Sequence, residues 1–380
     1  MGGVAAEAGT GLRVGVCGTQ RASTACVAEM CVSEHGTSGR LAAAVLVVAL
    51  LHFAQSVFVP LTFSLFVIAL VWPLQAGLQR HLPKLLALLT TLSFTIVVIV
   101  AIGSLTAWGF GKLAQWLFFN AGRLQAIYMD WAAWLDGQGV AIVGPITDRF
   151  DIRWFVGVVQ GIAGRLNSLT GFTLLVFIFI MLGLLEVDDF NARLSQRDAQ
   201  PFGDKILRAN REIGRKLRRF MLVRSFASVL TGLVVWGFAW LAGLELAPAW
   251  GAIAFALNYI PFLGPLIATV FPTLFAIAQF ASWQMAVLVF LSLNVIQFII
   301  GSYLEPRLAG ASLKISPFAV IFAVFFFSFL WGLAGAFIGV PILIAFIAYC
   351  AQDPSSRWLV VLLSTTSTVS RTEGRAQLPD

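Results

Sequence analysis

Hydrophobic and polar positions follow one another in long blocks along this chain, rather than in the short periods of a soluble domain. Uncharged apolar runs approach or exceed the roughly 20 residues that a helix needs to cross a bilayer. Short polar or charged connections separate them. The block pattern predicts an all-α, polytopic membrane protein with about eight transmembrane helices. The expected crossings are residues 41–59, 61–78, 85–110, 169–185, 220–244, 250–280, 285–303 and 317–349.

Pro60 separates the first two apolar runs. Proline disrupts a helix interior but suits the first turn of a helix. We therefore expect a tight hairpin at Pro60. Its uncharged tip would lie across the membrane from the basic connection at 79–84, because basic loops favour the cytoplasmic side.

Two further segments are amphipathic rather than wholly apolar. In residues 111–167, apolar residues recur every three to four positions up to the glycines and proline of 137–145, which predicts an interfacial helix outside the membrane. Residues 187–219 contain nine Lys/Arg and five Asp/Glu. This segment predicts a basic cytoplasmic helix on the anionic inner leaflet that leads directly into the crossing at 220–244.

The two longest apolar runs are interrupted by glycine and proline. Residues 250–280 contain NYIPFLGP (258–265), and residues 317–349 contain WGLAGAFIGVP (331–341). If each run crosses once, there are eight spans with both ends inside. If either run folds back as a re-entrant hairpin, the count changes, as does the side on which Glu305 lies. The sequence leaves both arrangements open.

The first interruption supplies polar chemistry at membrane depth. Pro261 lacks a backbone donor, so it frees carbonyl groups near Asn258, and Gly264 permits close approach and unusual dihedral angles. Such a break is tolerated only where protein or water satisfies it, and paired breaks point to a transporter's binding site. The site would hold a neutral polar solute or a small cation. The expected path residues are Asn258, Tyr259, Pro261, Gly264, Pro265, Asn294, Gln297, Glu305, Pro306, Arg307, Gly335 and Pro341.

Glu305 follows directly on an apolar run. Its carboxylate anchors the helix end at the interface, pairs with Arg307, or relays a proton or cation. His52, which stands alone in the first run, is interpreted as a donor in helix packing rather than as a proton carrier.

Composition agrees with a membrane protein. Hydrophobic residues make up 59% of the chain and charged residues 11%, against roughly 45–50% and 25% in soluble domains. The net charge of +7 gathers at the ends of apolar runs rather than in a stripe with aromatics, which argues against nucleic acid. The four cysteines and three histidines have no metal-site spacing, and no nucleotide-binding or hydrolase motif is present. We therefore expect no enzyme activity, metal or cofactor.

The two ends of the chain are read separately from the membrane domain at 41–350. Residues 1–40 are rich in Gly, Ala, Ser and Thr and are expected to form a disordered cytoplasmic tail. An alternative is that the natural chain begins at Met30. Residues 351–380 are expected to be a second disordered tail.

Four segments together resemble a known family. They are PLTFSLFVIALVWPL (60–74), RKLRRFMLVRSFASVLTGLVVW (215–236), WGAIAFALNYIPFLGPLIATVFP (250–272) and the stretch 302–343, which begins SYLEPRLAG. In them the chain is similar to the autoinducer-2 exporter family, also called PerM-like permeases. The resemblance implies a multi-pass transporter of the bacterial inner membrane that assembles as a homo-oligomer. It also implies that members are linked either to autoinducer-2 export or to sodium/proton exchange.

The leading hypothesis is a secondary transporter or facilitator that exports a small polar solute past the first interruption. One alternative is a sodium/proton antiporter in which Glu305 alternates between cation and proton. The other is a scaffold that organises membrane partners through residues 111–167 without transporting anything.

Overall fold

The computed structural model describes residues 45–137, 170–309 and 315–364, with a few isolated positions elsewhere. Nearly all of these residues are helical, and the only extended pairing among them is an isolated bridge between Ile315 and Ser364. In this part of the chain, seven helices are long and apolar enough to cross a membrane, and a shorter apolar helix accompanies them. The prediction of an all-α, polytopic membrane protein is confirmed.

The chain divides into two units, residues 1–55 and 56–380. In the first unit, residues 45–53 are helical and a turn follows at Ala54. Helix α2 (Gln55–Leu78) then contains Pro60 in its second turn. The predicted hairpin at Pro60 is therefore wrong. Pro60 is so close to the start of α2 that its missing N–H leaves only one carbonyl, that of Ser56, without its helical donor. The helix therefore continues through Pro60.

Helix α3 (Lys84–Phe119) has 36 residues and extends beyond the predicted end at 110. At 1.5 Å per residue it is about 54 Å long, well beyond the roughly 30 Å of a hydrocarbon core. Helix α4 (Ala121–Gly137) follows after Asn120 and ends within the predicted glycine-containing stop. The sequence also predicts a second short amphipathic stretch at about 151–166, which falls almost entirely outside the described residues.

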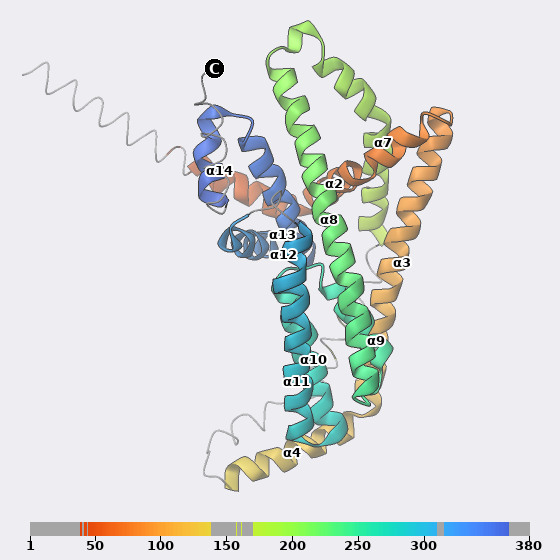
Figure 1. Cartoon of the computed structure of the whole chain (residues 1–380), viewed down its shortest axis with the longest axis vertical. Coiled ribbons are helices and arrows are strands. Elements are labelled where there is room, and N and C mark those ends of the chain that lie inside the picture. The colour runs from red at the N-terminus through yellow and green to blue at the C-terminus, as the bar shows by residue number, and fades with distance from the viewer. Residues whose placement is uncertain are drawn as a thin grey trace, which may run out of the picture. The chain divides into compact units, whose positions relative to one another are not determined.

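Helix α8 (Phe202–Leu241) is one helix of 40 residues, drawn in Figure 1 as a single long green helix. It confirms that the basic segment leads directly into the next crossing. Because α8 is unbroken, its basic half continues the axis of its apolar half. The placement of this basic half at the anionic inner leaflet stays a prediction. The preceding elements are α7 (Thr170–Leu194) and the short 3₁₀ turn η1 (Arg197–Ala199).

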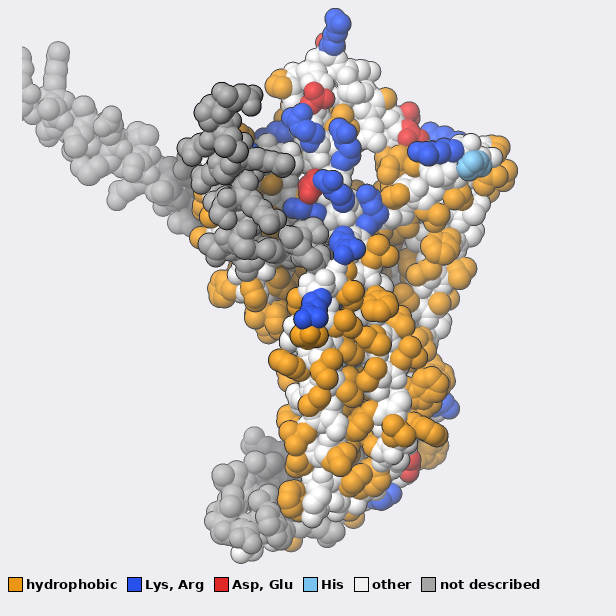
Figure 2. All heavy atoms as spheres, viewed as in Figure 1, with side chains coloured by type: hydrophobic (Ala, Val, Ile, Leu, Met, Phe, Trp, Pro, Cys, Tyr) orange, Lys and Arg blue, Asp and Glu red, His pale blue; other side chains and the backbone are white. Residues whose placement is uncertain are grey.

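Ion pairs and hydrogen bonds define two opposite ends of these helices. At the basic end, Lys84 lies 3.8 Å from Asp188, where α3 begins and α7 ends. At the far end, Arg123 of α4 donates to the carbonyl oxygen of Gln279 (2.8 Å). Figure 2 shows most of the visible lysine and arginine side chains in the upper part of the view, at the basic end, with hydrophobic side chains dominating below.

The first interrupted run forms two helices, α9 (Ala247–Leu257) and α10 (Leu263–Phe280). The side chain of Gln279 accepts from the backbone N–H of Glu245 and donates to the carbonyl oxygen of Gly243, both at 2.8 Å. The end of the run therefore lies beside the residues that precede its start, at the far end. We call α9, α10 and the turn between them the far-end hairpin. This run folds back and does not cross the membrane once.

The second interrupted run, α13 (Pro317–Cys350), is broken at Trp331 and Gly332, where Gly332 has a φ of 61°. A Cβ added at Gly335 would overlap the carbonyl oxygen of Phe327, and one added at Gly339 would lie 2.8 Å from that of Ala323. The arms 317–330 and 333–350 are therefore antiparallel. We call this pair the basic-end hairpin, because its ends lie on that side.

Two contacts place the basic-end hairpin. Asp353, just after it, pairs with Lys205 of α8 at 3.1 Å. Ser316, just before it, donates its backbone N–H to Leu363 of α14 (Arg357–Leu363) at 2.9 Å. The prediction of a disordered tail is wrong for α14, whose apolar residues pack against the arms of the hairpin. The 3₁₀ turn η4 (Pro354–Ser356) lies between α13 and α14.

The chain between the hairpins runs from the far end toward the basic end. Helix α11 (Trp283–Gln297) continues through the π-helical turn η2 (Phe298–Leu304) into α12 (Glu305–Ala309). Arg219 of α8 donates to the carbonyl oxygen of Leu308. Glu305 therefore lies toward the basic end, as the folded-back alternative requires.

Helix α9 packs very closely on α8. A Cβ added at Gly232 would lie 3.0 Å from the carbonyl oxygen of Gly251, and one added at Gly251 would lie 2.8 Å from that of Gly232. Small residues allow such contact, which drives helix association in lipid. Around Phe275, the rings of Trp116 and Trp250 have centroids 4.3 and 5.1 Å away, so an aromatic core fixes the base of the far-end hairpin.

Candidate functional site

The tip of the far-end hairpin is shaped by Pro261 and Gly264. Because Pro261 has no N–H, the carbonyl of Leu257 loses its usual helical donor and instead accepts from Ile260 at 2.9 Å. A Cβ at Gly264 would overlap that same carbonyl oxygen. The predicted close approach at Gly264 is confirmed, whereas the unusual dihedral angle falls on Phe262, which has a φ of 63°.

Two buried side chains at this tip face α8. Asn258 donates from Nδ2 to Oγ of Ser228, and the Tyr259 hydroxyl donates to Oγ of Ser225, both at 3.1 Å. Asn258 is 4% exposed and Tyr259 is 8% exposed. The two serines are three residues apart and share one face of α8. We call these four residues the tip site.

The tip site lies at membrane depth. The apolar half of α8 begins at Phe220 and ends at Leu241, at the far end. Along the helix axis, Ser228 lies about 12 Å from Phe220 and about 20 Å from Leu241. In this setting a polar group without a partner costs several kcal/mol, so the two hydrogen bonds account for how the tip is tolerated there.

The basic-end hairpin reaches the tip site through Phe337. Its ring centroid lies 6.0 Å from that of Tyr259, and 5.8 and 6.3 Å from those of Phe63 and Phe66 in α2. The two interrupted runs, which the sequence pairs only by their composition, are therefore in contact within the bilayer.

An ion pair between α8 and α12 lies nearby. Nη1 of Arg224 is 2.6 and 2.8 Å from the two carboxylate oxygens of Glu305. The Arg224 side chain is only 7% exposed, and its Nε and Nη2 have no hydrogen-bond partner among the described residues. The expected pairing with Arg307 is wrong, since the Arg307 guanidinium lies 4.0 Å above the ring of Tyr303 instead.

The π-helical turn η2 explains how Glu305 meets α8. The backbone N–H of Glu305 donates to Ile300, five residues back, and Pro306 has no N–H to continue the ordinary pattern. The wider turn holds one extra residue, which shifts the face of Glu305 by about a quarter turn.

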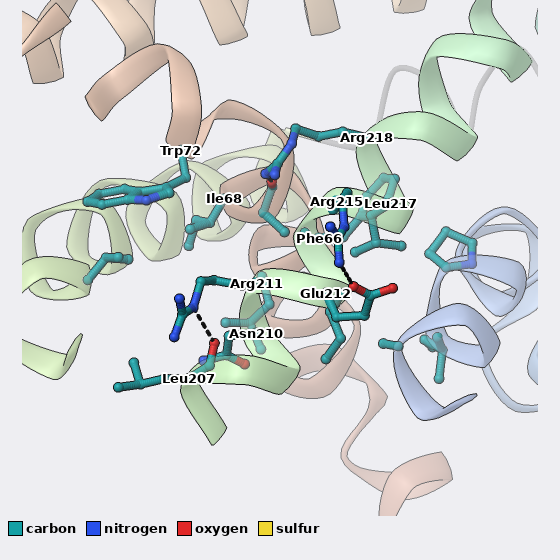
Figure 3. Close-up of a pocket in the computed structure, with 18 of the residues that line it drawn as sticks. Phe66, Ile68, Trp72, Leu207, Asn210, Arg211, Glu212, Arg215, Leu217 and Arg218 are labelled. Carbon is teal, nitrogen blue, oxygen red and sulfur yellow. Dashed lines mark hydrogen bonds and ion pairs between the residues drawn. The ribbon is translucent and has the colours of Figure 1, made fainter. Parts of the chain in front are cut away.

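Two cavities lie along α8, and the smaller of them adjoins the tip site. The larger, about 1320 Å³, lies at the basic end between α2, α7, α8 and the second arm of α13, and we call it the basic vestibule (Figure 3). The smaller, about 580 Å³, lies between α2, α3 and α8, and Tyr259, Ser225 and Phe337 reach its wall. Its other lining residues are almost all apolar, so we call it the apolar cavity.

A family model described as AI-2E family transporter matches residues 41–352. The chain belongs to this family. Its relatives include the AI-2 transport protein TqsA of Escherichia coli K12, which is 24% identical over 84% of this chain and 93% of the relative. YhhT of the same organism, named a putative transport protein, is 24% identical over 88% and 96%. YrrI of Bacillus subtilis 168, also a putative transport protein, is 25% identical over 76% and 84%.

This AI-2E family transporter is thus a multi-pass protein of the bacterial cytoplasmic membrane. The family, the transporter class and the membrane location predicted from the sequence are confirmed.

In the transporter, the predicted path residues do not all gather in one place. Asn294 is exposed on α11 and donates to its own helix at Phe290, and a nitrogen of Gln297 is buried without a partner among the described residues. Pro341 lines the basic vestibule. The remaining predicted residues have local roles: Gly335 lets the hairpin arms touch, the carbonyl of Pro265 accepts from Thr269, and Pro306 is exposed.

Sequence reasoning missed the partners that α8 contributes. Arg224, Ser225 and Ser228 lie within the crossing predicted at 220–244, and no role was predicted for them. One signal was available, because Arg224 stands four residues inside an apolar run, where an ionisable residue is by default functional. Nothing in the sequence indicates that Ser225 and Ser228 face the tip.

Proposed function

We propose that the transporter exports a small polar solute, similar to autoinducer-2, through the basic vestibule and past the tip site toward the far end. The observation that carries this proposal is the pair of buried hydrogen bonds, Asn258 to Ser228 and Tyr259 to Ser225, at the tip of a hairpin inside the membrane. The solute class comes from the name of the relative TqsA.

The tip site suits a neutral polar solute. An amide and three hydroxyl groups offer both donors and acceptors, without a net charge that would bind a cation or anion tightly. A polar solute can replace the hydrogen bonds that these groups make with one another by hydrogen bonds to itself. No buried donor or acceptor is then left without a partner, so binding avoids that energetic penalty. Tyr259 and Ser225 already reach the apolar cavity, which gives such a solute space beside them.

The charge distribution supports one orientation of the protein in the membrane. Basic segments of membrane proteins favour the cytoplasmic side, which assigns the basic end to the cytoplasm and the far end to the outside. The vestibule then collects solute from the cytoplasm, and the basic half of α8 lies among anionic headgroups of the inner leaflet. The homo-oligomer implied by the resemblance stays a prediction.

The sodium/proton antiporter alternative is less well supported by the geometry. A cation that binds Glu305 would have to displace the guanidinium of Arg224 from both carboxylate oxygens. That displacement would leave a buried positive charge without a partner, which costs about 3–5 kcal/mol. We therefore propose a structural or gating role for the pair, rather than cation exchange.

The test compares Asn258→Leu with Asn294→Leu in cells that lack their own autoinducer-2 exporters. Both variants make the same chemical change, but only Asn258 bonds to another helix, whereas Asn294 bonds to its own and is exposed. We expect Asn258→Leu to lower export of autoinducer-2 about tenfold or more and Asn294→Leu to change it less than twofold. The measurement is the ratio of external to internal autoinducer-2 by reporter assay.

Two results would count against the proposal. One is equal export by the wild type and Asn258→Leu at equal membrane levels of protein. The other is the same autoinducer-2 ratio in cells with and without the wild-type transporter, which would remove autoinducer-2 as the solute and favour a scaffold.

A further inference from the structure

The basic vestibule and the apolar cavity share a wall. Among the described residues that line them, two occur in both: Phe66 from α2 and Arg218 from α8. Phe66 is buried and Arg218 is half-buried. A solute that moved directly from the vestibule into the apolar cavity would have to cross this shared wall at Phe66 and Arg218.

The sequence of α2 explains where Arg218 is held. Pro73 has no N–H, so the carbonyl of Ala69, four residues earlier, has no donor within its own helix. Nη1 of Arg218 donates to that carbonyl oxygen at 3.0 Å. A helix-breaking residue in one helix thus creates the acceptor that fixes an arginine of another helix.

The sequence of α8 makes room for the same guanidinium. A Cβ added at Gly214, one turn before Arg218, would lie 3.0 Å from Nη1. An arginine that only reaches for lipid headgroups would extend outward along its own helix. Arg218 instead folds over a glycine and bonds to a neighbouring helix, and Figure 3 shows it among the residues that line the vestibule.

The vestibule is positively charged up to this point. Arg208, Arg211 and Arg215 line it from α8 together with Arg218. Glu212 is the one acidic residue among the described lining residues, and it is already paired with Arg215 and Lys216. Within the described part of the chain, no carboxylate lies within ion-pair distance of Arg218. Its charge is therefore available to a solute.

We propose that Phe66 and Arg218 form a selective gate, at which Arg218 favours small solutes with several acceptor oxygens over cations. The guanidinium offers several N–H donors in a plane, which match such solutes and repel cations. Phe66 closes the passage when no solute is present. This inference rests on the proposed path and adds a specificity-determining residue to it.

The test measures access to the apolar cavity without any transported solute. Thr95 is buried on the wall of that cavity alone, so Thr95→Cys reports on it in a chain whose native cysteines have been replaced. Inside-out membrane vesicles expose the proposed cytoplasmic face to two impermeant thiol reagents. One is an anionic sulfonate methanethiosulfonate and the other a cationic trimethylammonium methanethiosulfonate, and each labelling rate is divided by the rate with a free thiol.

We expect the anionic reagent to label position 95 faster than the cationic one. Arg218→Gln should lower the anionic-to-cationic rate ratio about tenfold, because it removes one positive charge at the constriction. Arg218→Lys should keep most of the ratio, and Phe66→Ala should raise both rates together. Arg215→Gln is the matched control, because Arg215 lines only the vestibule and is paired with Glu212. It should change the ratio less than twofold.

Three results would overturn the gate: a ratio unaffected by Arg218→Gln, equal falls for Arg215→Gln and Arg218→Gln, or no labelling from this face even in Phe66→Ala. Elution of each variant as a single species in detergent separates selectivity from misfolding. Because no solute is transported, failure of the gate leaves the tip-site proposal standing. Conversely, if the autoinducer-2 export test contradicts the tip-site proposal, the thiol-labelling result for the gate still stands.

Discussion

The far-end and basic-end hairpins solve the same steric problem with different chemistry. Each folds an apolar run back on itself within the bilayer, and each relies on a glycine, Gly264 or Gly335, whose Cβ would overlap a backbone carbonyl of the other arm. The far-end tip carries Asn258 and Tyr259, which bond to serines of α8. The basic-end hairpin turns at Trp331 and the adjoining glycine and presents Phe337 to the tip site. Glycine thus specifies the fold-back, whereas the residues at the tip specify its role.

The largest effect is expected where the hairpins are alike. Gly264→Ala and Gly335→Ala should each destabilise the protein by about 3 kcal/mol, because a rigid backbone must move to admit the methyl group. The measurement is thermal unfolding in detergent. Gly237→Ala is the matched control, since a Cβ there meets nothing within 4 Å. Loss of stability in only one of the two hairpin variants would break the structural parallel between them.

The next effect concerns the ion pair that joins α8 to α12. Glu305→Gln should destabilise the protein by about 3 kcal/mol because it leaves Arg224 buried and without its counter-charge. The double variant Arg224→Met with Glu305→Met should recover much of that loss, since no buried charge is left. Thermal unfolding of the single and double variants gives their coupling, and purely additive losses would show that the pair does not act as a unit.

A smaller effect should separate the two tips by function. Gly332→Ala should cost about 1–3 kcal/mol of stability, because its φ of 61° is strained for any residue with a side chain. It should leave the KM for solute unchanged. Ser228→Ala should cost about 1 kcal/mol and raise that KM several-fold. Transport by purified protein in liposomes distinguishes them, and a raised KM in Gly332→Ala would mean that both tips touch the solute.

The smallest effect is expected at the surface of the basic vestibule. Arg211 is exposed and donates to the carbonyl of Leu207 in its own helix. Arg211→Gln should change stability by less than about 0.5 kcal/mol, because surface substitutions away from special features do little. The same thermal assay applies, and a loss of 2 kcal/mol would show that the basic half of α8 is a buried element.

Helices, breaks and basic segments could be predicted from the sequence because each depends on local properties. Proline and glycine mark NYIPFLGP as a break whatever surrounds it, and the alternation of charged and apolar faces marks the basic half of α8. Pro60 was misread, since the cost of a proline depends on its depth within a helix, and that depth required knowing where α2 begins.

The rest of the site depends on contacts between distant parts of the chain. Whether a run crosses or folds back is decided by bonds such as those from Gln279 to residues more than 30 positions earlier. Ser225 and Ser228 are ordinary helix residues until Tyr259 and Asn258 meet them. Of the alternatives for Glu305, the pairing with its sequence neighbour Arg307 is wrong, because nearness in sequence does not imply nearness across a π-helical turn.

The far-end hairpin also has an arithmetic consequence. A segment that returns to its starting side adds an even number of passages, so α8 and α11 count as consecutive crossings in opposite directions. This parity brings Arg224 and Glu305, which are 81 residues apart, to the same level of the membrane. One straight passage of residues 250–280 would reverse the parity and put the carboxylate on the opposite face. The ion pair therefore requires that the chain between α8 and α11 crosses the membrane an even number of times, or not at all.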